Sequence, residues 1–344
     1  MAVARLSVVC GEHGTHDVAS RLRDLAEWIA GDMVGFEAEL SGLARGGSVV
    51  HRSAHHLLDV GGKHLRPVCV VLAAKLGSGF GPVARNLAMA VELMHNATLL
   101  HDDVIDVGER RRGQPAARMV YGNAATVLAG DWLLVEALRR IRQSGHHELL
   151  APALDTLDDM IAAEAIQLEN RGRVNVNRDD YFRVVDGKTA ALFRLAMRAG
   201  AIAGGLPADQ VNALERYGTH FGAAFQLVDD LLDVTGDPAI MGKTTFSDLH
   251  EGKMTYPLLL ALERDAALGR WVERLLRERT GEPLPSHIRN RVQRRLLTTG
   301  SIRDCRALAR KRAQDAVDCL RPIPDGPGRS VLASLAAIPV EREG

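Results

Sequence analysis

The sequence predicts an all-α protein built as one large bundle of helices. Aromatic residues make up only 4% of the chain, and no segment alternates with a period of two between hairpin turns, so signals typical of strands are scarce. Apolar residues instead recur every three or four positions through most of the chain. The segment Ala84–Leu100 is apolar almost all round, which is typical of a helix in the centre of a bundle.

The other predicted helices are separated by short breaks rich in Gly and Pro, such as 77–79 and 322–324. They cover Ser20–Ala44, Ala125–Ser144, His147–Arg171, Arg178–Gly204, Ala208–Thr235, Tyr256–Glu263, Pro285–Thr299, Ser301–Leu320 and Gly328–Ala337. No long linker or low-complexity segment divides the chain. We therefore expect residues 1–344 to form a single domain.

The composition argues against several partners and compartments. Lys plus Arg and Asp plus Glu both number 43, so no basic excess favours nucleic acid as a partner. Cys10, Cys69, Cys305 and Cys319 show neither metal-ligand nor redox spacing. The N-terminal apolar run is too short for a signal peptide, and no stretch approaches the ~18 apolar residues of a transmembrane helix. We expect a cytoplasmic protein with no transmembrane segment and no nucleic acid partner.

The first acidic motif, HDDVID, contains Asp102, Asp103 and Asp106. On a helix, Asp102 and Asp106 share one face, about 5–6 Å apart. Their charges repel by roughly 1–3 kcal/mol, and the apolar segment before them adds a desolvation cost. Hard oxygen ligands on one face suit Mg²⁺, which takes its remaining ligands from water and phosphates. Alone, the motif is equally typical of a solvated acidic turn.

A second acidic motif repeats this pattern far along the chain. Asp229, Asp230 and Asp233 lie in FQLVDDLLDVTGD, where an apolar segment again runs into Asp-Asp-apolar-apolar-Asp. Two such copies are much harder to obtain by chance than one. Two facing carboxylate clusters would hold several Mg²⁺ ions with one diphosphate between them.

Basic residues near both motifs would complete a site for diphosphates. Each alone is more typical of a solvated surface charge, but with the carboxylates they form a consistent set, because Arg and Lys bind phosphate oxygens well. They are Lys63, Arg66, Arg111, Arg112, Lys188, Lys243 and Lys253.

From about Leu57 to Leu262 the chain resembles the trans-isoprenyl diphosphate synthases, or polyprenyl synthetases. Seven blocks carry the resemblance in family order: GGKHLRP, VELMHNATLLHDDVID, RRGQP, GNAATVLAGDWLL, DGKTAALF, FQLVDDLLDVTGD and GKTTFSDLHEGKMTYP. The ordered set is highly specific, although any one block alone would not be. It implies the isoprenoid synthase fold, in which antiparallel helices surround a deep central cavity. It also implies a homodimer, and we assign the flanks to outer helices and dimer packing.

The resemblance implies a magnesium-dependent prenyltransferase, with three Mg²⁺ ions per active site, that condenses an allylic diphosphate with isopentenyl diphosphate head to tail. The allylic C–O bond ionises, the isopentenyl double bond attacks the cation, and a proton leaves to the departing diphosphate. No side-chain nucleophile is required, and the chain has no Ser-His-Asp or Cys-His signature. The protein positions the substrates, stabilises the leaving diphosphate and excludes water.

The resemblance also implies roles for individual residues. Asp102, Asp106 and Asp229 would be the main Mg²⁺ ligands, supported by Asp103, Asp230 and Asp233. Isopentenyl diphosphate would be held by Lys63, Arg66, His95 and Arg112. The allylic diphosphate would be held by Arg111, Lys188, Lys243 and Lys253. Thr189 and Gln226 would lie near the reacting carbons.

His95 and His64 are two of the histidines within the blocks that carry the resemblance. His95 lies seven residues before Asp102, two turns along the same helix face. A lone His on an apolar helix is usually a satisfied core residue, and only the resemblance makes ligand contact the better interpretation. His64 stands where the family usually has Arg, so binding of isopentenyl diphosphate is expected to depend more on pH.

The residues before the first motif bear on product length. The growing tail is expected to run down the cavity past Ala97 and Thr98, where family members that stop early carry a bulky aromatic residue. Both residues are small here, which favours a product longer than farnesyl diphosphate. Met94 is the first sizeable obstacle on this helix, and Leu134 and Leu138 on the next helix are further candidates.

Three alternatives remain at this stage. A geranylgeranyl diphosphate synthase would have the same site and a shorter product. A terpene cyclase would share the fold and the first motif, but its second metal motif is Asn/Asp-x-x-Ser/Thr-x-x-x-Glu. A non-catalytic subunit of a heteromeric synthase would usually have lost one or both acidic motifs, and both are intact here.

Overall fold

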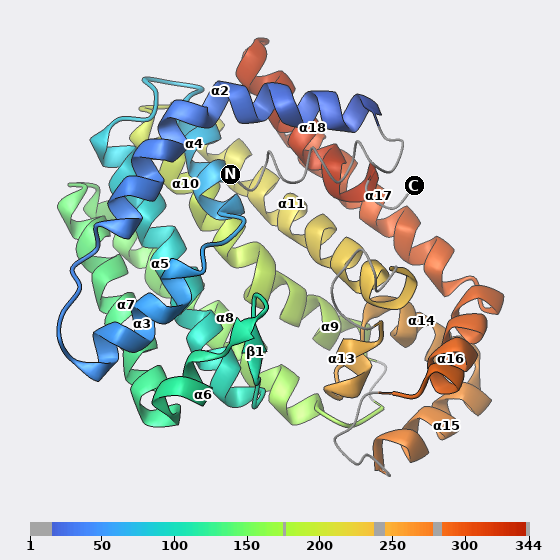
Figure 1. Ribbon diagram of the computed structural model, residues 1–344. Helices are drawn as coiled ribbons and strands as arrows, with labels where there is room; N and C mark the ends of the chain where they lie inside the picture. The colour runs from blue at the N-terminus through green and yellow to red at the C-terminus, as the bar shows by residue number, and fades with distance from the viewer. Residues whose placement is uncertain (1–15, 175–176, 237–244, 278–283, 342–344) are drawn as a thin grey trace. The chain divides into compact units, whose positions relative to one another are not determined.

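The computed structural model describes residues 16–174, 177–236, 245–277 and 284–341. Helices make up nearly all of the regular structure in this part of the chain (Figure 1). The all-α prediction is therefore confirmed. None of the described helices is both long and apolar enough to cross a membrane.

The chain divides into two compact units. The first unit comprises Met1–Asp155, Leu192–Arg216 and Leu320–Ser334, and the second comprises Thr156–Ala191, Tyr217–Cys319 and Leu335–Gly344. The expected single domain over residues 1–344 stays a prediction.

The first unit is built around a buried central helix, α5 (Pro82–Ile105). The side chains of Leu93, Met94 and Leu100 on α5 are fully buried, as its almost uniformly apolar sequence predicts. The other elements of this unit are α2 (His16–Ser41), α3 (Val49–Asp59), α4 (Leu65–Ala74), β1 (Arg110–Arg111), β2 (Gln114–Pro115), α6 (Ala117–Tyr121), α7 (Asn123–Gln143), η1 (His147–Leu149) and most of α10 (Ala191–Ala203).

The second unit has its own apolar core. Leu227 and Leu231 of α11 (Ala208–Thr235) pack there with Leu258 of α14 (Tyr256–Arg264) and Ala309 of α17 (Ser301–Cys319). The remaining elements of this unit are most of α8 (Leu150–Asn170), α9 (Arg178–Val184), η2 (Val185–Ala190), α13 (Ser247–His250), α15 (Ala266–Arg277) and α16 (Ser286–Thr298). The last helix, α18 (Pro327–Glu341), has residues in both units.

The described residues include one short hairpin for which the sequence analysis found no strand signal. Strands β1 and β2 pair antiparallel, with Arg110 opposite Pro115 and Arg111 opposite Gln114. The turn residues Arg112 and Gly113 both have positive φ, 52° and 81°, as the tight turns that match strand twist require. Two-residue strands carry no alternating pattern, so the sequence gives no signal for them.

The structure also revises the helix assignments. Helices α3, α4, α6, α13 and α15 were not predicted, because short helices flanked by Gly or by charged residues give weak periodic signals. The single helix predicted over Arg178–Gly204 contains a π-helical segment, η2. At Gly187 within η2, an added Cβ would lie 2.4 Å from the carbonyl oxygen of Asp159 on α8. Glycine therefore permits the close approach of η2 to α8.

Candidate active site

The first acidic motif lies at the C-terminal end of α5. The Asp106 N–H donates to the carbonyl oxygen of Asp102 over 2.8 Å, which places both residues on one helical turn. Asp102 and Asp106 are partly exposed, whereas Asp103 is only 1% exposed. The predicted pair of carboxylates on one face is therefore present, and it excludes Asp103.

Asp103 is bound by a predicted diphosphate ligand, Arg111. The Nε and Nη2 atoms of Arg111 donate to Oδ1 of Asp103 over 2.8 and 2.6 Å. Burial raises the pKa of Asp103, and the bond to Arg111 opposes that rise. Among the described residues Asp103 Oδ2 has no hydrogen-bond partner. This arrangement makes Asp103 the residue that orients Arg111.

The hairpin holds Arg112 against the glycine loop that precedes α4. Its Nη1 donates to the carbonyl oxygen of Gly61, and an added Cβ on Gly62 would lie 2.9 Å from Nη2 of Arg112. Gly62 therefore leaves room for the guanidinium. The next residue of the loop, Lys63, is exposed. Two of the four residues predicted to bind isopentenyl diphosphate thus lie at one loop.

Arg66 and His95, the other two residues predicted to bind isopentenyl diphosphate, contact each other directly. Arg66 Nη1 lies 3.2 Å from His95 Nε2, and the Arg66 guanidinium lies 4.7 Å from the centroid of the Phe193 ring. Burial, reinforced by the charges of Arg66 and Arg112, lowers the pKa of His95 well below its ordinary value. Burial also lowers the pKa of Arg66 to about 10. At neutral pH a neutral His95 therefore accepts from a charged Arg66.

His64 occupies a constrained position at the start of α4. Its φ of 45° is left-handed, which is uncommon for a residue other than Gly. Nδ1 of His64 lies 2.9 Å from Oε1 of Glu92, a carboxylate that is 1% exposed and that also accepts from Asn96 Nδ2 over 3.1 Å. The buried partner Glu92 was not predicted, because no motif spacing links it to the loop.

The second acidic motif lies near the C-terminal end of α11 in the second unit. Asp229 is exposed, whereas Asp230 and Asp233 are 3% and 1% exposed. Asp233 Oδ1 accepts from the N–H of Ser247 over 3.0 Å and from its hydroxyl over 2.6 Å. This buried carboxylate therefore anchors the start of α13.

Asp230 accepts three hydrogen bonds within the second unit. Oδ1 accepts from Gln226 Nε2 over 2.9 Å, and Oδ2 accepts from the Tyr181 hydroxyl and the Tyr256 N–H, each over 2.8 Å. Burial raises the pKa of Asp230 to about 7, against the lowering effect of these donors. The same network continues to Thr189, whose hydroxyl lies 2.8 Å from Oε1 of Gln226.

The predicted lysines of this unit already contact carboxylates. Lys188, in η2, is paired with Glu164 on α8, and Lys253 Nζ lies 2.7 Å from Glu251 Oε2. Lys243 lies outside the described residues. Glu164 was missed because it lies 24 residues before its partner, a separation that no local pattern indicates.

The chain-length candidates lie on two helices of the first unit. Met94 and Ala97 on α5 are fully buried, and the partly buried Thr98 donates its hydroxyl to the carbonyl oxygen of His95 over 2.8 Å. Leu134 and Leu138 on α7 are partly buried. These positions are compatible with a wall of small and medium side chains, but their contact with a product stays a prediction.

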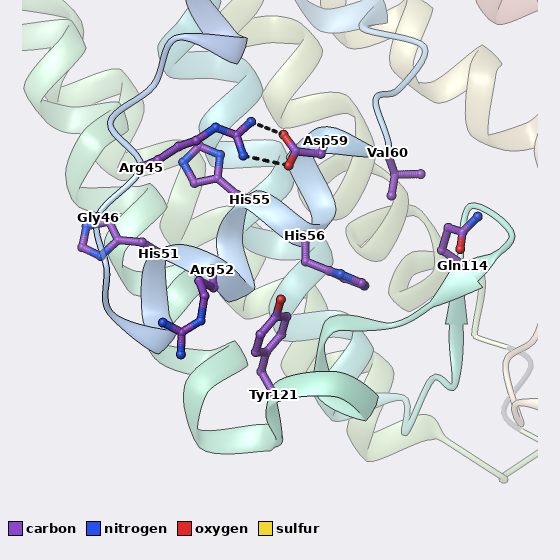
Figure 2. A pocket seen from close by; sticks show the side chains of 10 residues that line it. All are labelled: Arg45, Gly46, His51, Arg52, His55, His56, Asp59, Val60, Gln114 and Tyr121. Atoms are coloured by element: carbon purple, nitrogen blue, oxygen red, sulfur yellow. Dashed lines mark hydrogen bonds and ion pairs between the residues drawn. The ribbon is translucent and has the colours of Figure 1, made fainter.

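A pocket of about 690 Å³ lies in the first unit between the loop before α3, α3 itself, β2 and α6 (Figure 2). Arg45 and Asp59 form a two-bond ion pair across it, with distances of 2.6 and 3.0 Å. Arg52 donates to the carbonyl oxygen of Gly47, and His56 Nε2 lies 2.9 Å from the carbonyl oxygen of Pro115 in β2. Arg45, Asp59 and Arg52 are thus bonded to the protein itself, and His56 contacts the hairpin that carries Arg112.

The acidic residues suit a cation that takes few protein ligands. Within the described residues, no three His, Cys, Asp or Glu side chains gather into a metal cage. Mg²⁺ is held through one or two carboxylates, with water and phosphate oxygens completing the coordination. Asp102, Asp106 and Asp229, the three carboxylates of the motifs that reach solvent, fit that mode of binding. Because the two motifs belong to different units, their facing stays a prediction.

Comparison with known proteins adds independent information. The sequence matches the family model described as Polyprenyl synthetase over residues 48–284. It is 33% identical to the octaprenyl diphosphate synthase of Escherichia coli strain K12 over 324 residues, 94% of this chain and 99% of that protein. It is 34% identical to a short chain isoprenyl diphosphate synthase of Methanothermobacter thermautotrophicus over 298 residues, 85% of this chain and 90% of that protein. The crystal structure of a decaprenyl diphosphate synthase from Rhodobacter capsulatus matches with a TM-score of 0.85 at 35% identity, covering 93% of this chain and 98% of that one.

Proposed function

The chain belongs to the polyprenyl synthetase family, and on this basis we propose that it condenses an allylic diphosphate with isopentenyl diphosphate. The product is an all-trans polyprenyl diphosphate longer than farnesyl diphosphate. The observation that carries this proposal is the presence of both acidic motifs with Asp102, Asp106 and Asp229 reaching solvent. Relatives that make octaprenyl and decaprenyl diphosphates match over nearly the whole chain and support the long product.

Isopentenyl diphosphate is assigned to the first unit. Arg66 and Arg112 are charged donors with planar guanidinium groups, which suit diphosphate oxygens, and Lys63 is exposed beside them. The neutral His95 accepts from Arg66 and fixes the orientation of its guanidinium. Lys63, Arg66 and Arg112 thus present positive charge from the loop, α4 and the hairpin.

The allylic diphosphate is assigned to Arg111, Lys188, Lys243 and Lys253. Arg111 is oriented by Asp103, and Lys188 by Glu164. Thr189 and Gln226 are assigned to the neighbourhood of the reacting carbons, where their oxygen atoms would stabilise developing positive charge. The carboxylate partners keep both cations in place before substrate binds.

Three Mg²⁺ ions per active site complete the proposal, with Asp102, Asp106 and Asp229 as ligands. When bound, Mg²⁺ would supply positive charge that makes diphosphate a better leaving group. Asp103, Asp230 and Asp233 are assigned here to positioning, since each is buried and bonded to protein donors. Chelation of Mg²⁺ by EDTA is expected to abolish turnover.

We further propose a cytoplasmic homodimer. Apolar side chains of α6 and α7 are exposed in the first unit, among them Met119, Leu128 and Val135 at 53%, 54% and 46%. Leu128 and Val135 lie two turns apart on one face of α7. The described cysteines Cys69, Cys305 and Cys319 are all unbridged, as is usual in a reducing compartment.

The dimer is tested by light scattering of the eluting protein. The parent chain is expected at twice the monomer mass, and the Leu128→Arg/Val135→Arg variant at the monomer mass, because paired charges are costly to bury in an interface. The double substitution Ala307→Arg/Gln314→Arg, at two exposed positions of α17, serves as control and should leave the dimer intact. A monomeric parent chain would contradict this part of the proposal.

His64 gives the binding of isopentenyl diphosphate a testable pH dependence. The expectation is tested by the KM for isopentenyl diphosphate, measured across pH in the parent chain and in His64→Arg. Arg carries a permanent charge at this position, so His64→Arg is expected to give a flatter profile than the parent chain. His147→Arg, at an exposed position of η1, is the control. Identical KM profiles for the parent and His64→Arg would refute this role.

The reaction class is tested with the purified chain, Mg²⁺ and farnesyl diphosphate, with and without isopentenyl diphosphate. Diphosphate release that requires isopentenyl diphosphate is expected. Release from farnesyl diphosphate alone would instead indicate a terpene cyclase. No release in either assay would indicate a subunit that needs a partner chain.

A further inference from the structure

A chain of hydrogen bonds in the second unit connects α9 to the π-helical segment η2. It runs from the Tyr181 hydroxyl to Asp230 over 2.8 Å, from Asp230 to Gln226 over 2.9 Å, and from Gln226 to the Thr189 hydroxyl over 2.8 Å. This series of hydrogen bonds begins at Tyr181, which belongs neither to the sequence motifs nor to the assigned substrate contacts.

The direction of proton donation along this chain is set by Asp230. Gln226 Nε2 lies 2.9 Å from Oδ1 of Asp230, so the side chain of Gln226 turns its donating NH₂ group toward this carboxylate. The amide oxygen of Gln226 then faces Thr189, and the Thr189 hydroxyl donates to it. Because its proton is donated to Gln226, the Thr189 oxygen keeps lone pairs for a second partner.

Both oxygens of Asp230 are already occupied by protein donors. Oδ2 accepts from the Tyr181 hydroxyl and the Tyr256 N–H, and Oδ1 accepts from Gln226. The carboxylate is also 3% exposed. Asp230 is therefore placed to order its neighbours and is poorly placed to bind a metal ion.

Tyr181 is held rigidly enough to act on Asp230. Its ring centroid lies 5.2 Å from that of Phe182 and 5.0 Å from that of Tyr256. Burial, together with the nearby charge of Asp230, raises the pKa of Tyr181 well above its ordinary value. The hydroxyl therefore remains a proton donor throughout the pH range in which enzymes are assayed.

We propose that Tyr181 is a positioning residue for prenyl transfer: through Asp230 it fixes the Gln226 amide so that the oxygens of Gln226 and Thr189 face the developing allylic cation. This inference rests on the proposed function, because it takes Thr189 and Gln226 to lie beside the reacting carbons. It adds Tyr181 on α9 to the residues that position the reacting groups. It also assigns Asp230 to orienting Gln226 and not to binding a metal ion.

The test is Tyr181→Phe, which removes one hydroxyl and keeps the ring. The kcat of elongation is expected to fall about tenfold, which corresponds to about 1.4 kcal/mol. The KM for isopentenyl diphosphate and the half-saturating Mg²⁺ concentration should both stay within about twofold, because neither the first-unit cations nor the assigned Mg²⁺ ligands change.

A matched control separates the hydroxyl from the packing of the ring. Phe182→Leu disturbs the same aromatic cluster without removing a donor to Asp230. It is expected to lower the Tm while kcat stays within about twofold of the parent. Equal losses of kcat in Phe182→Leu and Tyr181→Phe would show that ring packing matters and that the hydroxyl does not, which would overturn the proposal.

A double-mutant cycle with Gln226→Ala tests the route of the effect. If Tyr181 acts through Gln226, the double variant loses no more kcat than Gln226→Ala alone. The proposal would be overturned if the losses of kcat in the two single variants multiplied in the double variant. A shift in the half-saturating Mg²⁺ concentration of Tyr181→Phe would overturn it as well. A parent chain without elongation activity would instead refute the proposed function itself, so the two failures are distinguishable.

Discussion

Replacing Asp102 or Asp229 by Ala is expected to lower turnover by at least about 10³-fold, or about 4 kcal/mol. Both carboxylates reach solvent and are assigned as Mg²⁺ ligands. Removing one withdraws charge stabilisation that the leaving diphosphate needs in the transition state. Steady-state incorporation of labelled isopentenyl diphosphate at saturating Mg²⁺ measures the loss.

Because Asp102 and Asp229 reach solvent, their replacement should separate a loss of turnover from a loss of folding. Surface substitutions usually change stability by no more than about 0.5 kcal/mol, so Asp229→Ala should unfold near the parent Tm. The Tm of Asp102→Ala, at a partly exposed position, is measured beside it. Glu109→Gln, at an exposed acid beyond the first motif, is the matched control and should retain parental turnover. Near-normal turnover in both Asp variants would contradict the assigned mechanism.

Enlarging Ala97 is expected to shorten the product. Ala97 is fully buried on α5, five residues before the first motif, and a larger side chain would obstruct a tail that grows past it. Product length should decrease in the order Ala97→Val, Ala97→Leu and Ala97→Phe. Chromatography of the dephosphorylated products against prenyl alcohol standards measures the length directly.

Ala88 provides a matched control for this series. It is also fully buried on α5, and its separation of nine residues from Ala97 turns it to the opposite side of the helix. Ala88→Leu should cost stability, since overpacking costs about 1–3 kcal/mol, without changing the product distribution. An unchanged distribution across the Ala97 series would remove Ala97 from the length control.

Sequence reasoning located the two acidic motifs and paired Asp102 with Asp106 by helical spacing, but it could not rank all six carboxylates by geometry. The pattern Asp-Asp-x-x-Asp does not show which of its aspartates bind Mg²⁺. Only the resemblance favoured Asp102, Asp106 and Asp229 as the main ligands. The structure supplies a physical reason for the same ranking, since Asp103, Asp230 and Asp233 are buried and bonded to protein donors. Burial of single residues at a helix end depends on neighbours distant in sequence, which periodicity does not contain.

Other parts of the site were predicted only in outline. The contact of Arg66 with His95 follows the expected grouping, whereas Glu92, Glu164 and Tyr181 were missed. Each of these three bonds to a predicted residue more than 20 positions away. The π-helical segment around Lys188 was likewise missed, because its sequence has the same helical period as its surroundings.

The central claim is that this chain alone elongates an allylic diphosphate beyond farnesyl length. Purified protein, Mg²⁺, farnesyl diphosphate and excess isopentenyl diphosphate are incubated, and the products are separated by chain length. The expected result is a series of all-trans polyprenyl diphosphates that ends well beyond geranylgeranyl diphosphate. A product that stops at geranylgeranyl diphosphate would contradict the proposed length, and the absence of any elongated product would contradict the proposed activity.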